Sequence, residues 1–350
     1  EMDLMFQLFV DHITKELLIE MGEPTDLVGL LLRSSELLLT DYHPDETDMQ
    51  FMRIRGYERL AGAVYSELVK SSRMFNARPV SSGASIELNP QAVWQQIAQD
   101  ASLGLVEESN PIHNLKEKEV VTFAGTGGRN SRSMVKKTRI YHKNDMGVIS
   151  EATVDSSDVA ITTYLTADPN FTTLRGTTKL YAKGSVGPTA LLSTSALLAP
   201  AATHDDPKRV NFINIQNSAG ISAVGYKPTP LRTGYEQVIA HRTDDLFAYT
   251  AKGKGTIVAV DDKHITIEYA DGVKRSVELG RRFGISAGTT LPHTVVSDLK
   301  LGDKVKDGEI VAYNSDFFQK DLFNPKQVLW KAGVLAKTAI FECTDTLEDS

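Results

Sequence analysis

The sequence has a single cysteine, Cys343, so it cannot form an intramolecular disulfide framework, and this usage fits a reducing compartment. No apolar run approaches the roughly 20 residues that a membrane helix needs. The first residues, "EMDLMFQLFVDH", are acidic and lack a small-residue cleavage site, unlike a secretory signal peptide. These absences predict a soluble, cytoplasmic protein with no membrane partner.

Several catalytic and metal-binding motifs are missing as well. The eight histidines never fall into the His-Glu-x-x-His or Cys/His spacings of zinc sites, and no Gly-x-Ser-x-Gly nucleophile turn is present. The turn "AGTGG" (124–128) invites comparison with a phosphate loop, but it lacks the Gly-Lys-Ser/Thr ending and follows no clear strand. We therefore expect neither a directly held metal ion nor nucleotide binding by this turn alone.

What is present is an ordinary globular composition. The chain has 350 residues, of which 41% are hydrophobic and 24% charged, and this length is enough for two or three domains with a sizeable core. It begins with Glu1 and ends with "TLEDS". Both a window of a longer polypeptide and a split subunit fit these ends.

Hydrophobic periodicity divides the chain into a helical part and a strand-rich part. The first 75 residues carry apolar positions at helical spacing, and "LNPQAVWQQIAQDASLG" predicts a further helix that begins at Asn89–Pro90 and stops at Gly104. After Gly128, segments rich in Val, Ile, Thr and Tyr predict strands, including a hairpin of "GTIVAV" and "HITIEYA" followed by "DGVKRSVEL". The expected fold class is α+β, with helices first and then a β-rich barrel or sandwich.

A basic run stands directly behind the glycine-rich turn. The whole protein carries a formal charge of -7, yet 129–143 contains no carboxylate. Its cations are Arg129, Arg132, Lys136, Lys137, Arg139 and Lys143. A one-signed cluster in a negative protein is expected where phosphates must be held locally, so we predict a basic strand facing nucleic acid. The alternative is a solvated surface strand.

Two further segments contain candidate site residues beside carboxylates. In "HDDPKR", Arg209 lies one turn inside a helix that is opened by two carboxylates, where it either meets a ligand or pairs with Asp205 or Asp206. At the end of the chain, Glu348 and Asp349 follow a largely apolar stretch. Adjacent carboxylates can contact a hydrated Mg²⁺ on a nucleotide, or they simply face solvent.

The order of these motifs along the chain is more informative than any one of them. The segments that matter are "MRIRGYERLAG" (52–62), "NPIHNLKEKEVVTFAGTGG" (110–128), "RIYHKNDMG" (139–147), "THDDPKRVNFINIQNS" (203–218), "PLRTGYEQVIA" (230–240), "LKLGDKVKDGEIVA" (299–312) and "LEDS" (347–350).

In this order the segments resemble the central part of the β subunit of multisubunit DNA-directed RNA polymerase. They look most like the split, divergent β subunits of giant (jumbo) bacteriophages, and the resemblance covers nearly everything from about Leu31 to Ser350. Positions that match the family's motifs are Arg53, Ile54, Arg55, Asn110, Pro111, Gly125, Gly127, Gly128, Arg139, His142, Gly147, His204, Asp205, Asp206, Arg209, Pro230, Leu231, Gly234, Glu236, Glu348 and Asp349.

The resemblance implies a role for each part of the chain. Residues 1–75 would be a helical region leading into the fork, and 76–165 a fork region with the basic strand, facing the RNA–DNA hybrid. Residues 166–200 would be a short external β insertion, and 201–350 a β-rich, barrel-type half of the active centre.

It also implies site residues. Arg209 would contact the triphosphate of the incoming nucleotide, and the acidic pair Glu348 and Asp349 would lie beside it and orient the second metal ion through water. Gly125, Gly127, Gly128, His204, Asp205 and Asp206 would shape the site. Nucleic acid would be contacted by Lys116, Lys118, Arg129, Arg132, Lys136, Lys137, Arg139 and His142.

Finally, it implies partners. No Asp-Phe-Asp-Gly-Asp-like loop is present, so Mg²⁺ would be held mainly by a β′-type subunit, and the chain would not be active alone. A second β polypeptide would supply the flap and the C-terminal part. Template DNA, the RNA transcript and nucleoside triphosphates complete the list, in the host cytoplasm, in a phage nucleus-like compartment or in the virion.

The sequence departs from the family at one signature. The Glu-Thr-Pro-Glu-Gly loop after the basic run is replaced by "TVDSS" (153–157), which fits a phage lineage. The competing interpretation is a non-enzymatic phage structural or tail protein with a helical arm and a β-rich body.

Overall fold

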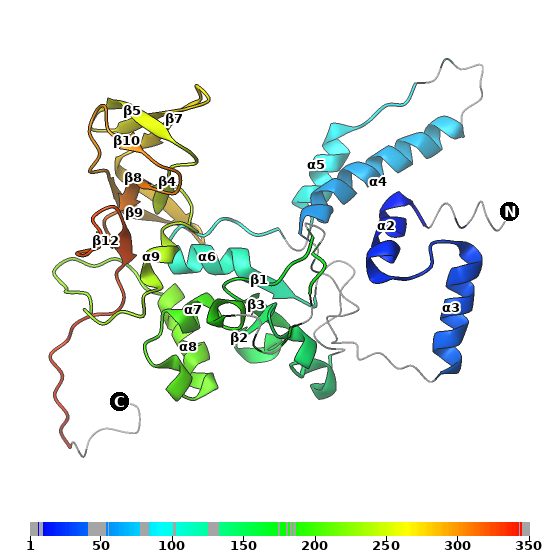
Figure 1. Cartoon of the computed structure of the whole chain (residues 1–350), viewed down its shortest axis with the longest axis horizontal. Coiled ribbons are helices and arrows are strands. Elements are labelled where there is room, and N and C mark those ends of the chain that lie inside the picture. The colour runs from blue at the N-terminus through cyan, green and yellow to red at the C-terminus, as the bar shows by residue number, and fades with distance from the viewer. Residues whose placement is uncertain are drawn as a thin grey trace. The chain divides into compact units, whose positions relative to one another are not determined.

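The computed structural model describes residues 10–40, 56–77, 85–100, 103–124, 134–173, 176–179 and 187–342, with isolated positions 6, 54, 83, 132, 181–182, 184 and 344. By its internal contacts the chain splits into two compact units, 1–48 and 49–350. Figure 1 shows the helical and β-rich parts in chain order by colour. Each unit is described separately below.

The first unit is a pair of helices, α2 (His12–Met21) and α3 (Leu27–Leu39). Asp11 caps α2, because its side chain accepts a hydrogen bond from the Thr14 N–H, and Asp26 caps α3 in the same way. Gly22 ends α2 at a φ of 75°, which a residue with a Cβ adopts only with strain. Neither helix contains a buried residue. The helices predicted here from periodicity are confirmed.

In the second unit, α4 (Tyr57–Asn76) packs against α5 (Pro90–Ala98). Asn89 accepts the Gln91 N–H and Pro90 occupies the first turn, as predicted, but the helix ends at Ala98, before the predicted stop at Gly104. Among the described residues, no helix has the length and apolar character needed to cross a membrane.

A small mixed region follows. Helix α6 (Pro111–Glu119) leads into β1 (Val120–Thr122), which joins β2 (Ile149–Thr153) and β3 (Thr162–Leu165) in an antiparallel sheet of order β1-β3-β2. Figure 1 shows α7 (Thr194–Leu197) and α8 (Pro207–Ser218) next to this sheet. The short 3-10 turns are η4 (Lys136–Arg139), η5 (Lys143–Asp145), η6 (Ser156–Asp158), η7 (Pro188–Ala190) and η8 (Ala202–His204).

The β-rich half contains two four-stranded sheets, of order β10-β5-β6-β7 and β4-β11-β9-β8, and a two-stranded sheet of β12 and β13. It is preceded by α9 (Glu236–Ile239). The strands are β4 (Ala248–Thr250), β5 (Gly255–Val260), β6 (His264–Tyr269), β7 (Lys274–Glu278), β8 (Gly280–Ser286), β9 (Thr289–Val296), β10 (Lys304–Val305), β11 (Ile310–Asn314), β12 (Phe318–Lys320) and β13 (Val328–Trp330).

The β core follows from strand alternation. Ile257, Ile265 and Ile267 are at most 1% exposed and pack together between the sheets, while the residues between them face outward. The hairpin predicted from "GTIVAV" and "HITIEYA" forms as β5 and β6, and β7 is the predicted third strand. Helices in the N-terminal part and a β-rich half confirm the α+β class.

One buried histidine joins the segment before α6 to the β half. His293 on β9 is 1% exposed and lies edge-on to Phe247 at a centroid distance of 5.5 Å. Its Nε2 donates to the Glu108 carbonyl at 2.7 Å, while its Nδ1 accepts from the Asn314 side chain at 3.0 Å. Gly284 leaves room for this contact, because a Cβ there would lie 2.7 Å from the Glu108 carbonyl oxygen. The joint therefore depends on these two hydrogen bonds and on the missing side chain at position 284.

The prediction of a basic strand is wrong. The described part of that segment forms η4 and η5, which are 3-10 turns. Local hydrogen bonds explain the difference: the Thr138 N–H and hydroxyl both bond the Val135 carbonyl, and His142 and Asp145 cap each other's backbone N–H groups. These bonds between near neighbours replace the partner strand that a ladder would require.

Between β3 and α7, the described residues contain an isolated bridge of Phe171 with Thr178 and no longer strand. The stretch "TKLYAKGSVG" (178–187), whose composition predicted a strand, is described only in part. The four-part division of the chain at residues 75, 165 and 200 stays a prediction.

Candidate functional site

The candidate site is built around the N-terminus of α8. Asp206 is its N-cap and accepts the Lys208 N–H at 2.8 Å, with Pro207 at the first helical position. Asp205 accepts the Asp206 N–H at 2.7 Å. Arg209 is exposed in the first turn and makes no ion pair with any residue that the structure describes. The alternative pairing of Arg209 with Asp205 or Asp206 is therefore not found, and its guanidinium faces solvent.

The inner face of α8 is largely polar. Its buried residues are Val210, Asn214 and Ser218, and the helix packs on α6, α7 and β2. The Ser195 hydroxyl donates to the Asn214 side-chain oxygen at 2.7 Å, in a fully buried bond. One turn earlier, the Asn211 side chain accepts the Thr153 N–H at 3.0 Å. Directional bonds of this kind fix the rotation of a helix about its axis more tightly than apolar contacts do.

Asn110 holds the other end of α8. Its side-chain nitrogen donates to the carbonyls of Asn217 at 2.9 Å and Gly220 at 2.7 Å, while its oxygen accepts the Ile112 N–H. One asparagine, 2% exposed, thus caps α6 and closes the end of α8. Asn110 entered the sequence argument only as part of an Asn-Pro match, and the dipeptide ahead of a helix is the signal that marks it as a cap.

The two lysines of α6 have partners within the protein. The Lys116 ammonium lies 4.9 Å from the centroid of the Tyr164 ring and 3.3 Å from the Ser218 hydroxyl, and burial lowers the pKa of Lys116. Burial likewise raises the pKa of Tyr164 to about 12, with the nearby Glu117 and Asp155 charges adding to it. Lys118 forms an ion pair with Asp244. Their predicted contact with nucleic acid stays a prediction.

The basic segment contributes both structural and solvent-facing cations. Arg139 donates to the carbonyls of Ser157 at 2.6 Å and Val159 at 3.2 Å, so it ties η4 to the loop after β2. His142 is the cap of η5. Lys136 and Lys137 are exposed, as are Arg132 and Lys143.

Some predicted site residues lie outside the described part of the chain. These are Gly125, Gly127, Gly128, Arg129, Glu348 and Asp349. His204 ends η8 and is exposed on the approach to α8. Within the described residues, no group of three or more His, Cys, Asp or Glu side chains could hold a metal ion.

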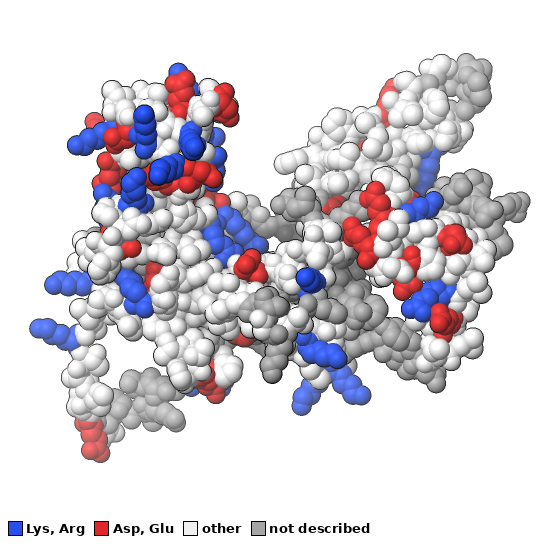
Figure 2. All heavy atoms as spheres, viewed as in Figure 1, with Lys and Arg blue, Asp and Glu red and all other residues white. Residues whose placement is uncertain are grey.

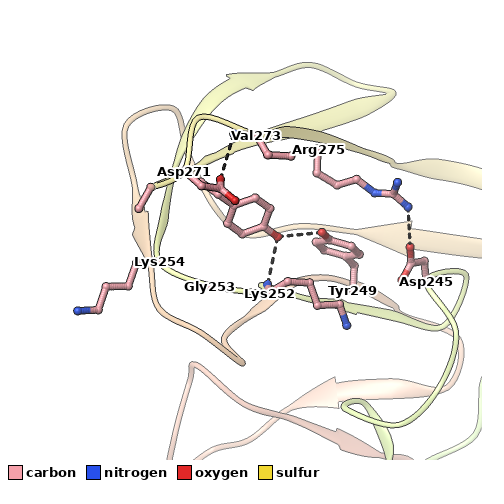
Figure 3. Close-up of a pocket in the computed structure, with 10 residues that line it drawn as sticks. Asp245, Tyr249, Lys252, Gly253, Lys254, Asp271, Val273 and Arg275 are labelled. Carbon is pink, nitrogen blue, oxygen red and sulfur yellow. Dashed lines mark hydrogen bonds and ion pairs between the residues drawn. The ribbon is translucent and has the colours of Figure 1, made fainter.

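A separate cavity of about 540 Å³ lies in the β half (Figure 3). The Tyr249 and Tyr269 hydroxyls meet at 2.8 Å inside it, the Lys252 N–H donates to Tyr269 at 3.1 Å, and Arg275 pairs with Asp245. Its polar groups mostly satisfy one another, and none of the predicted site residues lines it. The cavity is therefore distinct from the α8 site.

The N-terminal third of the chain is similar to a known protein family. Residues 1–132 match the family model for bacteriophage RNA polymerase. The match supports a phage RNA polymerase and a nucleotidyltransferase-type function in transcription. No curated protein matches the chain.

The phage RNA polymerase match covers α2 to α6 and the two α6 lysines, whereas Arg209 and the β half lie beyond it. It favours the RNA polymerase interpretation over that of a structural or tail protein. It is coarser than the resemblance to a β subunit, since it specifies neither a subunit nor a multisubunit enzyme.

Proposed function

We propose that this chain is part of the β subunit of a multisubunit, phage-encoded, DNA-dependent RNA polymerase, in which Arg209 stabilises the triphosphate of the incoming nucleotide. The observation that carries the proposal is the exposed guanidinium of Arg209, which pairs with no residue that the structure describes, on a helix whose inner face accepts hydrogen bonds from Ser195 and Thr153. The phage RNA polymerase match over residues 1–132 supports the reaction class.

The mechanism is electrostatic and positional. Nucleotidyl transfer builds negative charge on the departing pyrophosphate, and a cation that is already oriented stabilises that charge without reorganising. Ser195, Thr153 and Asn110 fix the rotation and the C-terminal end of α8, so the backbone position from which Arg209 extends is set before a nucleotide arrives. A preorganised donor of this kind contributes roughly 2–4 kcal/mol to the transition state.

The partners in the proposal are those that the resemblance to a β subunit implies. Mg²⁺, held mainly by a β′-type subunit, would supply Lewis acidity at the reacting phosphate, and Glu348 and Asp349 would orient it through water. A second β polypeptide would complete the subunit, and the complex would act on template DNA, RNA and nucleoside triphosphates in the host cytoplasm. The exposed Lys136 and Lys137 would face the hybrid or the template.

The test is template-directed nucleotide incorporation by the complex that copurifies with this chain. Arg209→Ala is expected to lower the rate at subsaturating nucleotide at least about tenfold, because the triphosphate loses a fixed cation. Lys208→Ala is the matched control: it removes an equally exposed charge from the same helical turn, and it should change the rate much less. Subunit composition is checked for every variant by gel filtration.

Equal losses in the two variants would mean that the surface charge of α8 matters and the direction of Arg209 does not. Incorporation that is indifferent to Arg209 would leave a polymerase subunit whose nucleotide contact lies elsewhere. Copurification without any incorporation would remove the polymerase proposal itself.

A further inference from the structure

Helix α7 places three consecutive hydroxyl side chains in the interior of the protein. Ser193, Thr194 and Ser195 are each at most 3% exposed. In the view of Figure 2, charged side chains gather over β5, β7 and β10, and few lie over α7. A hydroxyl is costly to bury unless it has a hydrogen-bond partner, and here each one bonds a different element of the chain. Ser193, the N-cap of α7, bonds Glu151 on β2 through both its hydroxyl and its backbone N–H.

Thr194 connects α7 to a largely buried ion pair. Its hydroxyl donates to the Glu119 carboxylate at 2.9 Å, and that carboxylate pairs at 2.8 Å with Arg242, in the turn directly after α9. Arg242 also donates to the Thr194 hydroxyl oxygen and to the Tyr235 hydroxyl, each at 3.2 Å. Burial raises the pKa of Glu119, and the Arg242 charge and the Thr194 hydroxyl counteract that rise. The Thr194 hydroxyl therefore stabilises the charge of a buried carboxylate.

Helix α8 is attached to α6 at two levels. Asn110, the cap at the start of α6, bonds the C-terminal end of α8 directly. Glu119, the last residue of α6, bonds Thr194 on α7. The next residue of α7, Ser195, bonds Asn214 in the middle of α8. A helix held at one level can still pivot, whereas hydrogen bonds at two levels fix its rotation about its own axis.

The rotation of α8 determines where Arg209 stands. Asn214 follows Arg209 by five residues, which is about 140° around a helix of 3.6 residues per turn. The two side chains therefore leave α8 on nearly opposite sides, Asn214 into the protein and Arg209 into solvent. A rotation of α8 that breaks the Ser195 bond at its back moves the Cα of Arg209 at its front. The connection through α7 thus bears directly on the position of this arginine.

We propose that Thr194 is a positioning residue for the nucleotide site at α8. Its bond to Glu119 fixes α7 against α6, the neighbouring Ser195 passes that position on to α8, and α8 places Arg209. Thr194 is buried, so it meets no nucleotide itself. Its role rests on the proposed function of Arg209 and deepens it, because part of the incorporation rate then depends on a side chain inside the protein.

The test is template-directed incorporation by the complex that copurifies with this chain, measured over a series of nucleotide concentrations to obtain kcat/KM. Thr194→Val removes the hydroxyl and keeps the branched shape of the side chain, whereas Thr194→Ser keeps the hydroxyl. Thr166→Val is the matched control, because Thr166 is 0% exposed and its hydroxyl bonds no residue that the structure describes. Gel filtration checks the subunit composition of each variant. Ser195→Ala, which breaks the next bond of the same connection, replaces the valine variant if that variant does not assemble.

Thr194→Val is expected to lower kcat/KM for the nucleotide at least about threefold, because a small displacement of a positioned group has a large effect on the rate. Thr194→Ser should restore most of this loss, since its hydroxyl can make the same bonds, and Thr166→Val should leave the rate unchanged. In a chain that already carries Arg209→Ala, Thr194→Val should have no further effect, because it acts through the position of Arg209. A residue that supports the fold in general would instead give the same fold loss in both backgrounds.

Three results would overturn this role of Thr194. The first is full activity of Thr194→Val, and the second is an equal fold loss in the native and Arg209→Ala backgrounds. The third is a serine variant as slow as the valine variant. In each of these cases a slow Arg209→Ala leaves the proposed function intact. Full activity of Arg209→Ala overturns the proposed function instead, and the role of Thr194 with it.

Discussion

The β core and helix α8 are held together by opposite means. Between β5, β6 and β7, Ile257, Ile265 and Ile267 bury apolar surface almost completely. The buried face of α8 instead contains Asn214 and Ser218 beside Val210, and its middle and C-terminal end are fixed by side-chain hydrogen bonds from Ser195 and Asn110. An apolar core supplies stability and tolerates changes of shape, whereas a polar contact specifies one orientation. Stability and precision are thus assigned to different parts of this chain.

The largest expected effect is in the β core. Ile267→Ala should lower the free energy of unfolding by about 2–5 kcal/mol, because a fully buried side chain leaves a cavity. Val260→Ala on the exposed end of β5 is the control and should cost much less. Urea unfolding followed by tyrosine and tryptophan fluorescence measures both. Equal costs would mean that this sheet is not packed as a core.

A smaller and more local effect is expected at α8. Asn110→Ala leaves the Asn217 and Gly220 carbonyls without their donor and removes the cap of α6, which should cost about 1–3 kcal/mol. Hydrogen exchange followed by mass spectrometry should show faster exchange in α8 with little change in β5 and β6.

Asn89→Ala is the matched control for this change, because Asn89 caps α5 in the same way, with its side chain accepting the Gln91 N–H, and lies outside α6 and α8. It should leave exchange in α8 unchanged. Uniformly faster exchange in the Asn110 variant, β strands included, would show that α8 and the β core unfold as one unit and would remove the contrast between them.

The smallest effect concerns pH. Burial raises the pKa of Asp244, but hydrogen bonds from Lys118 and Asn114 outweigh it, so the net pKa is lowered. The charged form therefore stabilises the fold above the unfolded pKa of about 3.9, and this contribution is lost as pH falls through the lower folded value. The stability gap between the native chain and Asp244→Asn should be under about 1 kcal/mol near neutral pH and vanish in acid.

Urea midpoints taken from pH 7 down to about 3 measure this gap. Asp262→Asn, in the exposed turn between β5 and β6, serves as the control for removing one surface charge. A gap that widens toward low pH would contradict the assigned sign.

Much of the fold could be predicted because local signals were strong. The alternation of β5 and β6 and the turns at Gly302 and Gly308, with φ of 86° and 74°, follow directly from residue order. So does Glu236, whose carboxylate accepts the N–H groups of Thr233 and Gly234 within three residues. Each of these features needs only near neighbours.

The polar support of α8 could not be predicted in the same way. Asn110 and Asn217 are more than a hundred positions apart, and an asparagine that bonds a distant carbonyl looks in sequence like one that faces water. In the basic segment the reason for failure is local. Its charge pattern is clear in the sequence, but the capping pair of His142 and Asp145 stabilises a 3-10 turn in place of the predicted strand. The positions of Glu348 and Asp349 lie outside the described residues and stay predictions.

The absence of a side chain at Gly284 has a consequence for how this protein can evolve. Most core positions of either half can drift among apolar residues of similar volume, because neighbours adjust. No larger residue can replace Gly284 in this way, because even one methyl group would lie within 2.8 Å of the Glu108 carbonyl oxygen and of the His293 ring. A glycine that performs no chemistry is therefore the residue that this fold requires where the segment before α6 meets β8 and β9.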